Sequence, residues 1–226
     1  MSQITERIAT AFLNIAMNKE DKSRDYLEST VASRGAAPTE FAAVLIAGGG
    51  SRRMGVDKAL LRVTWQGRQM PLWRRQLAVL KELEPSQLLL SGPQRPGSRV
   101  IAITDRWTSS GPLAGIATCL EFVSYEFLLV LAVDLPRIES ACLRLLLLHS
   151  ADGCGVVPVR EGRYEPLTAL YPKRALDFAL VRLGRSELKL QAFVQELVSV
   201  GLVRPWTVPV PIDEQFANWN SPSDAS

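Results

Sequence analysis

Residues 43–61 constrain the fold of this chain more than any other stretch; they read A-V-L-I-A-G-G-G-S-R-R-M-G-V-D-K-A-L-L. The first residues are apolar and uncharged, which is typical of a buried strand. Three glycines follow at 48–50, and a residue without a side chain lets the backbone approach a ligand closely. Free backbone N–H groups in such a loop, followed by cations such as Arg53 and Lys58, favour binding of a polyphosphate.

Two common phosphate-binding loops do not fit this segment. A P-loop requires Lys and Ser/Thr directly after its second glycine, whereas Val56 and Asp57 separate Gly55 from Lys58. The dinucleotide-binding fingerprint requires a third glycine where Arg53 stands. The segment therefore predicts a phosphate loop of another kind, and a purely structural glycine turn is the alternative.

Short apolar stretches alternate with helical patterns along the rest of the chain. The predicted strands lie at 88–90, 100–103, 127–133, 155–159 and 166–171, and the predicted helices at 71–83, 111–123, 140–149, 174–183 and 187–198. Val208 and Val210 alternate with prolines and predict at best an edge strand. Strands alternating with helices predict an α/β fold with three layers, α/β/α, around a mostly parallel sheet.

A glycine, a hydroxyl and two carboxylates stand where the predicted strands end, namely at Gly48, Ser91, Asp105 and Asp134. In sheets of this kind, ligands bind outside the carboxyl ends of the strands. Asp134 follows an apolar strand and precedes Pro136, and a rigid carboxylate there suits Mg²⁺, which takes its remaining ligands from phosphates and water. The ordinary alternative for Asp134 is a turn or helix-capping aspartate.

Residues 46–58 resemble the loop L-A-G-G-x-S-x-R-M-G-x-D-K of the molybdenum cofactor guanylyltransferases, which are MobA-like nucleotidyltransferases; only Ile46 departs from it. Further motifs of this family follow in the same order. They are G-P-L-A-G at 111–115, D-x-P at 134–136, P-L-x-A-L-Y at 166–171 and N-x-N at 218–220. The resemblance spans about residues 41–224 and implies a Rossmann-like nucleotidyltransferase fold.

The resemblance implies transfer of GMP from GTP to the molybdenum-molybdopterin cofactor, with release of pyrophosphate. It implies catalytic roles for Arg53, Lys58 and Asp134, with Asp134 as the Mg²⁺ ligand. The positions it implies for GTP binding are Ile46, Ala47, Gly48, Gly49, Ser51, Lys58, Ser91, Asp105, Gly111 and Asp134. Those it implies for the pterin side of the cleft are Pro166, Asn218 and Asn220.

Three other functions remain open at this point, and one of them is that of a more distant nucleotidyltransferase that acts on a sugar phosphate. Related enzymes that use CTP tend to read L-A-A-G, whereas Ala47-Gly48-Gly49 favours guanine. A protein of another class, a nucleotide-binding adaptor with an inactive site, would use its N-terminal residues on a partner. The presence of both Lys58 and Asp134 argues against that function.

Residues 1–40 differ from the rest of the chain. Ile4, Ile8, Phe12 and Ile15 recur at helical spacing, so an extension with an amphipathic helix and a linker is expected at 1–40, and the nucleotidyltransferase domain at 41–226. This extension could dock on other cofactor-biosynthesis proteins or on molybdoenzyme chaperones.

Composition limits the partners and the compartment. The net charge of +3 gives no reason to expect nucleic acid, and no run approaches the roughly 20 apolar residues that span a membrane. The three cysteines form no C-x-x-C pair, and the N-terminus lacks the pattern of a signal peptide. We therefore expect a cytoplasmic protein.

Overall fold

An eight-stranded mixed sheet lies at the centre of the protein in the computed structural model, which describes residues 37–48, 57–107 and 111–219. Its strands are β1 (Ala42–Ile46), β4 (Gln87–Ser91), β5 (Ile101–Ile103), β6 (Phe127–Ala132), β7 (Gly155–Arg160), β8 (Arg163–Tyr164), β9 (Thr168–Pro172) and β10 (Val203–Thr207). They run in the order β10-β7-β9-β6-β1-β4-β5, with β8 paired to β7.

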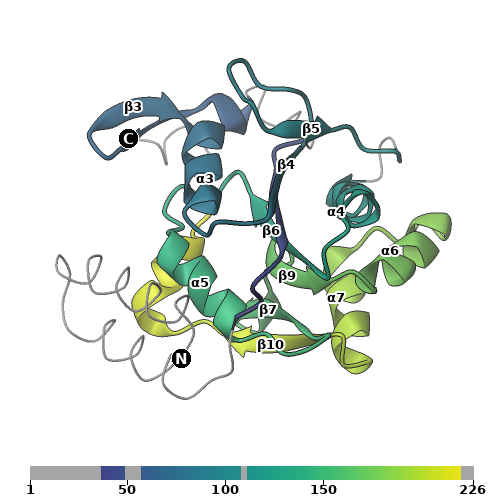
Figure 1. The fold of residues 1–226 in the computed structure, drawn as a ribbon. Coiled ribbons are helices and arrows are strands. Elements are labelled where there is room, and N and C mark those ends of the chain that lie inside the picture. Colours follow the sequence, from purple (N-terminus) through teal and green to yellow (C-terminus); the bar gives the residue numbers. More distant parts are fainter. Residues whose placement is uncertain (1–36, 49–56, 108–110, 220–226) are drawn as a thin grey trace.

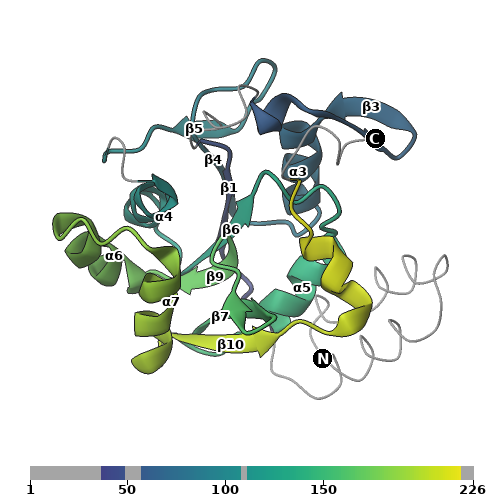
Figure 2. The ribbon, with the colours of Figure 1, turned by 180° about the vertical axis from the view of Figure 1, so that it is seen from behind.

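Helices cover both faces of this sheet, as the two opposite views show (Figures 1 and 2). One face carries α3 (Leu72–Lys81), α5 (Ser140–Leu148) and the 3-10 helix η3 (Val210–Phe216). The other carries α4 (Gly111–Phe122), α6 (Ala175–Gly184) and α7 (Leu190–Ser199). The predicted three-layer α/β fold is therefore confirmed.

The strand β1 explains why the layers form, because its side chains alternate between two hydrophobic cores. Ala43 and Leu45 pack in the core beneath α3 and α5, whereas Val44 and Ile46 pack in the core beneath α4. All five residues of β1 are buried. A strand buried on both faces needs a continuous apolar run, which is what the sequence contains.

The four strands β6, β1, β4 and β5 are mutually parallel and place their carboxyl ends together. In the register of this sheet, Ile46 is opposite Ser91 on one side and Ala132 on the other, and Ser91 is opposite Ile103. The strand β9 is antiparallel to both β6 and β7. The parallel half of the sheet thus creates one edge at which loops from four strands meet.

Two hairpins and the edge strand differ from the sequence-based expectation. A hairpin of β2 (Arg62–Trp65) and β3 (Arg68–Pro71) precedes α3, and β8 forms a second short hairpin with β7. The expected edge strand at Val208 and Val210 is wrong, because the edge strand is β10 and Val210 begins η3. Pro205 is accommodated in β10 because this strand lies at the end of the sheet.

The expected extension falls almost entirely outside the described residues, which begin at residue 37. The division of the chain at residue 40 therefore remains a prediction. Over the part of the chain that is described, no helix is long and apolar enough to cross a membrane.

Candidate active site

Lys58 and Asp134 form a pair of opposite charges at the edge of the sheet where the carboxyl ends of the parallel strands lie together. Lys58 begins the 3-10 helix η2 (Lys58–Leu60), and Asp134 follows β6. The Nζ of Lys58 lies 3.4 Å from Oδ2 of Asp134, and both side chains are partly buried, at 19% and 29% exposure. A cation and a carboxylate side by side can receive a ligand that itself carries a metal ion and phosphate groups.

The loop that carries Asp134 is held by hydrogen bonds from three directions. The N–H of Val133 donates to the Ile46 carbonyl at 3.2 Å, and the N–H of Trp219 donates to the Asp134 carbonyl at 3.0 Å. From α3, the fully buried Gln76 donates its Nε2 to the Leu135 carbonyl at 2.8 Å. The backbone of Asp134 is therefore fixed on both sides, and its carboxylate remains available to a ligand.

The Gln76 amide is itself oriented by a neighbouring buried residue. Nη1 of Arg75 donates to Oε1 of Gln76 at 2.6 Å, which leaves Nε2 of Gln76 to face the Asp134 loop. Burial lowers the pKa of Arg75 to about 10, and the negative charges of Glu139 and Glu82 oppose that shift. Arg75 thus remains a cation at neutral pH and a donor to Gln76.

Two glycines bring the loop after β1 against the loop after β4. A Cβ on Gly92 would lie 2.7 Å from the Gly48 nitrogen and 2.8 Å from its Cα, and Gly92 has a φ of +123°. The N–H of Ala47 also donates to the Ser91 carbonyl at 3.0 Å. No side chain fits between these two backbones, so their close contact sets where the glycine-rich segment begins.

Ser91 and Asp105 meet as their positions at strand ends predict. The buried Ser91 hydroxyl donates to Oδ1 of Asp105 at 3.2 Å. Burial raises the pKa of Asp105, and the hydrogen bond from Ser91 opposes that shift. Gly115 lies beside both, because a Cβ there would come within 2.8 Å of the Ser91 hydroxyl. The second glycine of G-P-L-A-G therefore lets α4 approach this pair.

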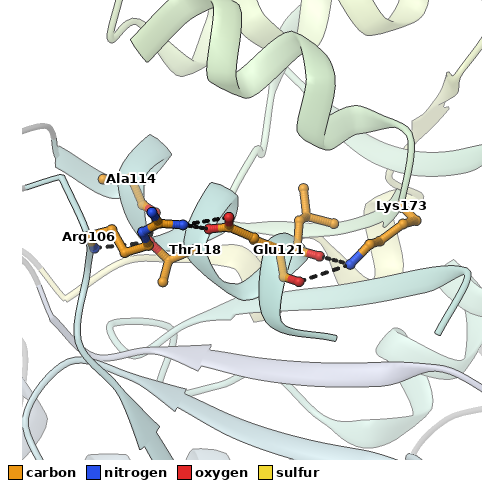
Figure 3. Close-up of polar contacts among 6 residues, drawn as sticks. Arg106, Ala114, Thr118, Glu121 and Lys173 are labelled. Carbon is orange, nitrogen blue, oxygen red and sulfur yellow. Dashed lines mark hydrogen bonds and ion pairs between the residues drawn. The ribbon is translucent and has the colours of Figure 1, made fainter. Parts of the chain in front are cut away.

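Polar contacts hold α4 in this position, as Figure 3 shows. The N–H of Arg106, the residue after Asp105, donates to the Thr118 hydroxyl at 3.3 Å, and Nη1 of Arg106 pairs with Glu121 at 2.5 Å. At the other end of the helix, Lys173 donates to the carbonyls of Leu120 and Val123 (Figure 3 draws its contacts with the helix end). Asp105 is thereby tied through its neighbour to the middle of α4.

The residues expected on the pterin side also come close to the Asp134 loop. Pro166 is buried, and its neighbour Leu167 accepts a hydrogen bond of 2.7 Å from the N–H of Ala132, at the end of β6. Asn218 is exposed and directly precedes Trp219, whose N–H contacts Asp134. These two positions thus flank the Asp134 loop.

The C-terminal segment that carries Asn218 is anchored by Arg160 at the end of β7. Nε and Nη2 of Arg160 each donate to the Asp213 carboxylate at 2.7 Å, and Nη1 donates to the Phe216 carbonyl at 3.1 Å. These hydrogen bonds from Arg160 lower the pKa of Asp213. Arg160 therefore orients η3 and the residues that lead to Asn218.

Several of the expected site residues lie outside the described residues, namely Gly49, Ser51, Arg53 and Asn220. Among those described, Ile46, Ala47, Gly48, Lys58, Ser91, Asp105 and Asp134 gather at the strand edge. Gly111 begins α4 with a φ of +64°. Sequence reasoning missed Gln76 and also Arg95, whose buried guanidinium pairs with Asp57 beside Lys58. The only signal was that Gln76 interrupts the apolar face expected for the helix at 71–83.

The carboxylates at the candidate site suit a divalent cation only if other groups complete its coordination. Within residues 37–48, 57–107 and 111–219, no three His, Cys, Asp or Glu side chains are grouped as metal ligands. A metal held wholly by protein groups does not fit this part of the chain. Mg²⁺ that arrives with a triphosphate fits, because it needs only one or two carboxylates, and Asp134 supplies one that is partly exposed.

Comparison with known proteins gives consistent matches. Residues 43–200 match the family described as MobA-like NTP transferase domain. The chain is 38% identical to a probable molybdenum cofactor guanylyltransferase of Opitutus terrae, over 81% of this chain and 92% of that protein. It is 32% identical to a protein of the same description from Bacillus licheniformis, over 80% of this chain and 92% of that protein.

A solved structure shares the fold. The crystal structure of molybdopterin-guanine dinucleotide biosynthesis protein A from Archaeoglobus fulgidus superposes with a TM-score of 0.60 at 22% identity, and covers 81% of this chain and 94% of that one. At this level of identity, the likeness supports the arrangement of strands and helices and leaves the chemistry to be argued from the residues.

Proposed function

The chain belongs to the MobA-like NTP transferase family and is a nucleotidyltransferase of the molybdenum cofactor guanylyltransferase group, and we propose that it transfers GMP from GTP to molybdenum-molybdopterin. Pyrophosphate leaves, and the guanine dinucleotide form of the cofactor is the product. The observation that carries this proposal is the Lys58–Asp134 pair at the edge where four parallel strands end.

Nucleotidyl transfer requires positioning and charge neutralisation more than covalent work by side chains. Lys58, together with Arg53 and the N–H groups of the glycine-rich segment, holds the triphosphate in this proposal. Ser91, Asp105 and the first turn of α4 bind on the nucleoside side. The acceptor is a phosphate group that is largely ionised near neutral pH, so no dedicated general base is required.

Mg²⁺ is part of the proposal, and Asp134 is the residue that would hold it. When bound, this ion supplies charge neutralisation on the phosphate oxygens. The role of the protein is to fix the Asp134 backbone through Gln76, Ile46 and Trp219, so that the carboxylate faces the triphosphate from a constant position. Pro166, Asn218 and Asn220 line the acceptor side in this scheme.

The cysteines bear on the compartment in which the reaction takes place. Cys119, Cys142 and Cys154 are free thiols, which is consistent with a reducing compartment, and we place the reaction in the cytoplasm. Other cofactor-biosynthesis proteins or molybdoenzyme chaperones would receive the product, and the extension before residue 41 is the part of the chain proposed to contact them.

Base selectivity is the first test. GTP with Mg²⁺ is expected to stabilise the protein more than ATP, CTP or UTP, because a ligand that binds only the folded state raises its stability in proportion to RT ln(1 + [L]/Kd). At a GTP concentration of 100 Kd, the gain is about 2.7 kcal/mol. For a chain of 226 residues this corresponds to a rise in Tm of about 5–10 °C.

The measurement is thermal unfolding at matched concentrations of the four nucleotides, with and without Mg²⁺. Guanine preference is motivated by the sequence Ala47-Gly48-Gly49 and by the relatives named above. An equal or larger rise in Tm with CTP would instead identify a cytidylyltransferase, and no rise with any nucleotide would contradict nucleotide binding by this protein.

A further inference from the structure

Arg95 lies in the loop between β4 and β5 and contacts two segments that are separate in the sequence. Its Nη1 is 2.5 Å from Oδ2 of Asp57, and its Nη2 donates to the Ala47 carbonyl at 3.0 Å. Its side chain is only 7% exposed. Because both nitrogens belong to one planar guanidinium, Arg95 fixes the position of Asp57 relative to Ala47.

Ala47 and Asp57 are the described residues on either side of the glycine-rich segment. Ala47 follows β1, and Asp57 directly precedes Lys58. The second carboxylate oxygen of Asp57, Oδ1, accepts a hydrogen bond of 3.0 Å from the N–H of Ala59 and so caps η2. Asp57 therefore uses one oxygen to meet Arg95 and the other to orient the helical turn that begins at Lys58.

Arg95 and Asp57 are buried to different degrees, and this difference decides which of the two should be substituted in a test. Removing Asp57 would leave the guanidinium of Arg95 buried without its carboxylate, and an uncompensated buried charge strongly destabilises a fold. Removing Arg95 leaves Asp57, which is 39% exposed and can be solvated by water. Substitution of Arg95 therefore disturbs the fold less than substitution of Asp57.

We propose that Arg95 is a positioning residue for the triphosphate site, because Arg95 holds Lys58 in place through Asp57. The chain of contacts runs from Arg95 to Asp57, from Asp57 to the backbone beside Lys58, and from the Lys58 ammonium to Asp134. This inference rests on the proposed function, because it assigns Arg95 a role in binding the nucleoside triphosphate of that reaction.

The test begins with Arg95→Met, which keeps a long side chain and removes the charge and its hydrogen bonds. Titration calorimetry should show the Kd for GTP with Mg²⁺ raised by about tenfold. In steady-state kinetics, KM for GTP should rise by a similar factor while kcat changes by less than about threefold, because binding rather than the chemical step is affected. Arg95→Lys retains the cation and should bind GTP with an intermediate Kd.

A double-mutant cycle separates positioning from general loosening of the fold. If Arg95 acts by holding Lys58, then Lys58→Ala should weaken GTP binding by at least tenfold in the unchanged protein and by no more than about threefold in Arg95→Met. The matched control is Arg182→Met, because Arg182 is 12% exposed and pairs with Glu187 and Glu196 between α6 and α7. This variant should lose stability and keep its Kd for GTP.

The outcomes distinguish this inference from the proposed function. Unchanged GTP binding in Arg95→Met, or in Arg95→Lys if Arg95→Met does not fold, would overturn the inference alone. The inference would also be overturned if the fold-changes in the Kd for GTP caused by Lys58→Ala and by Arg95→Met simply multiplied in the double variant. If the unchanged protein binds no nucleoside triphosphate at all, the proposed function and the inference both fail.

Discussion

Asp134→Asn is expected to reduce turnover by about 10³-fold while the protein remains folded. The substitution keeps the shape of the side chain and removes the negative charge that we propose recruits Mg²⁺. Its carbonyl oxygen can still accept a hydrogen bond from Lys58, which lies 3.4 Å from Oδ2 of Asp134, and the backbone bonds to this loop are unaffected. Steady-state kinetics at limiting and saturating Mg²⁺, with thermal unfolding as a check on folding, measure this effect.

Two further variants give this prediction its controls. Lys58→Ala should weaken GTP binding itself, by on the order of 1.5–3 kcal/mol, because the variant lacks the charged hydrogen bond that we propose Lys58 donates to a phosphate oxygen. Asp177→Asn is the same substitution at an exposed position of α6, and it should leave turnover unaltered. Normal turnover of Asp134→Asn at limiting Mg²⁺ would show that the metal assignment is wrong and would make Asp105 the next candidate.

Gly92→Ala is expected to damage both stability and GTP binding. A Cβ at residue 92 would lie 2.7 Å from the nitrogen of Gly48, and the φ of +123° is one that side chains rarely tolerate. We expect the free energy of unfolding to fall by about 2–4 kcal/mol. Because backbone atoms of Gly48 must move to relieve the contact, the start of the glycine-rich segment moves as well, and the Kd for GTP should rise.

Gly201→Ala is the matched control for this prediction. Gly201 also has a positive φ, +73°, but nothing lies within 4 Å of the position a Cβ would take. The Gly201→Ala variant should therefore lose about 1 kcal/mol of stability from backbone strain and keep its affinity for GTP. Denaturant unfolding gives the free energies and calorimetry the Kd values. If both variants bound GTP equally well, the close contact between Gly48 and Gly92 would not matter for the site.

Much of the fold could be predicted because its signals are local. The apolar run of β1 is buried on both faces, and the ends of β1, β4, β5 and β6 are marked by small or polar residues that a parallel sheet brings to one edge. The meeting of Ser91 with Asp105 and the place of Asp134 both follow from that rule.

The hairpins were missed because their turns carry unusual residues. Gln66-Gly67 and Glu161-Gly162 both have positive φ at each position, which is the geometry of a type I′ turn. Such turns are usually marked by Asn-Gly or Asp-Gly, and Gln or Glu at the first position gives no comparable signal. The edge strand β10 was missed for a related reason, because Pro205 argues against a strand everywhere except at an edge.

The supporting residues of the site could not be predicted because their partners are remote in the sequence. Arg95 contacts residues 38 and 48 positions away, and Gln76 contacts residues 56 and 59 positions away. Neither sits in a motif, and their roles exist only once the sheet and α3 are assembled. Local pattern therefore predicts the candidate ligand-binding residues better than the residues that hold them in place.

Incubation of the purified protein with molybdenum-molybdopterin, Mg²⁺ and an equimolar mixture of GTP, CTP, ATP and UTP tests the central claim most directly. The products are the dinucleotide form of the cofactor, identified by mass, and pyrophosphate. The account predicts the guanine dinucleotide with one pyrophosphate released per cofactor converted. Formation of the cytosine dinucleotide instead, or no nucleotidyl transfer by a protein that binds GTP, would contradict it.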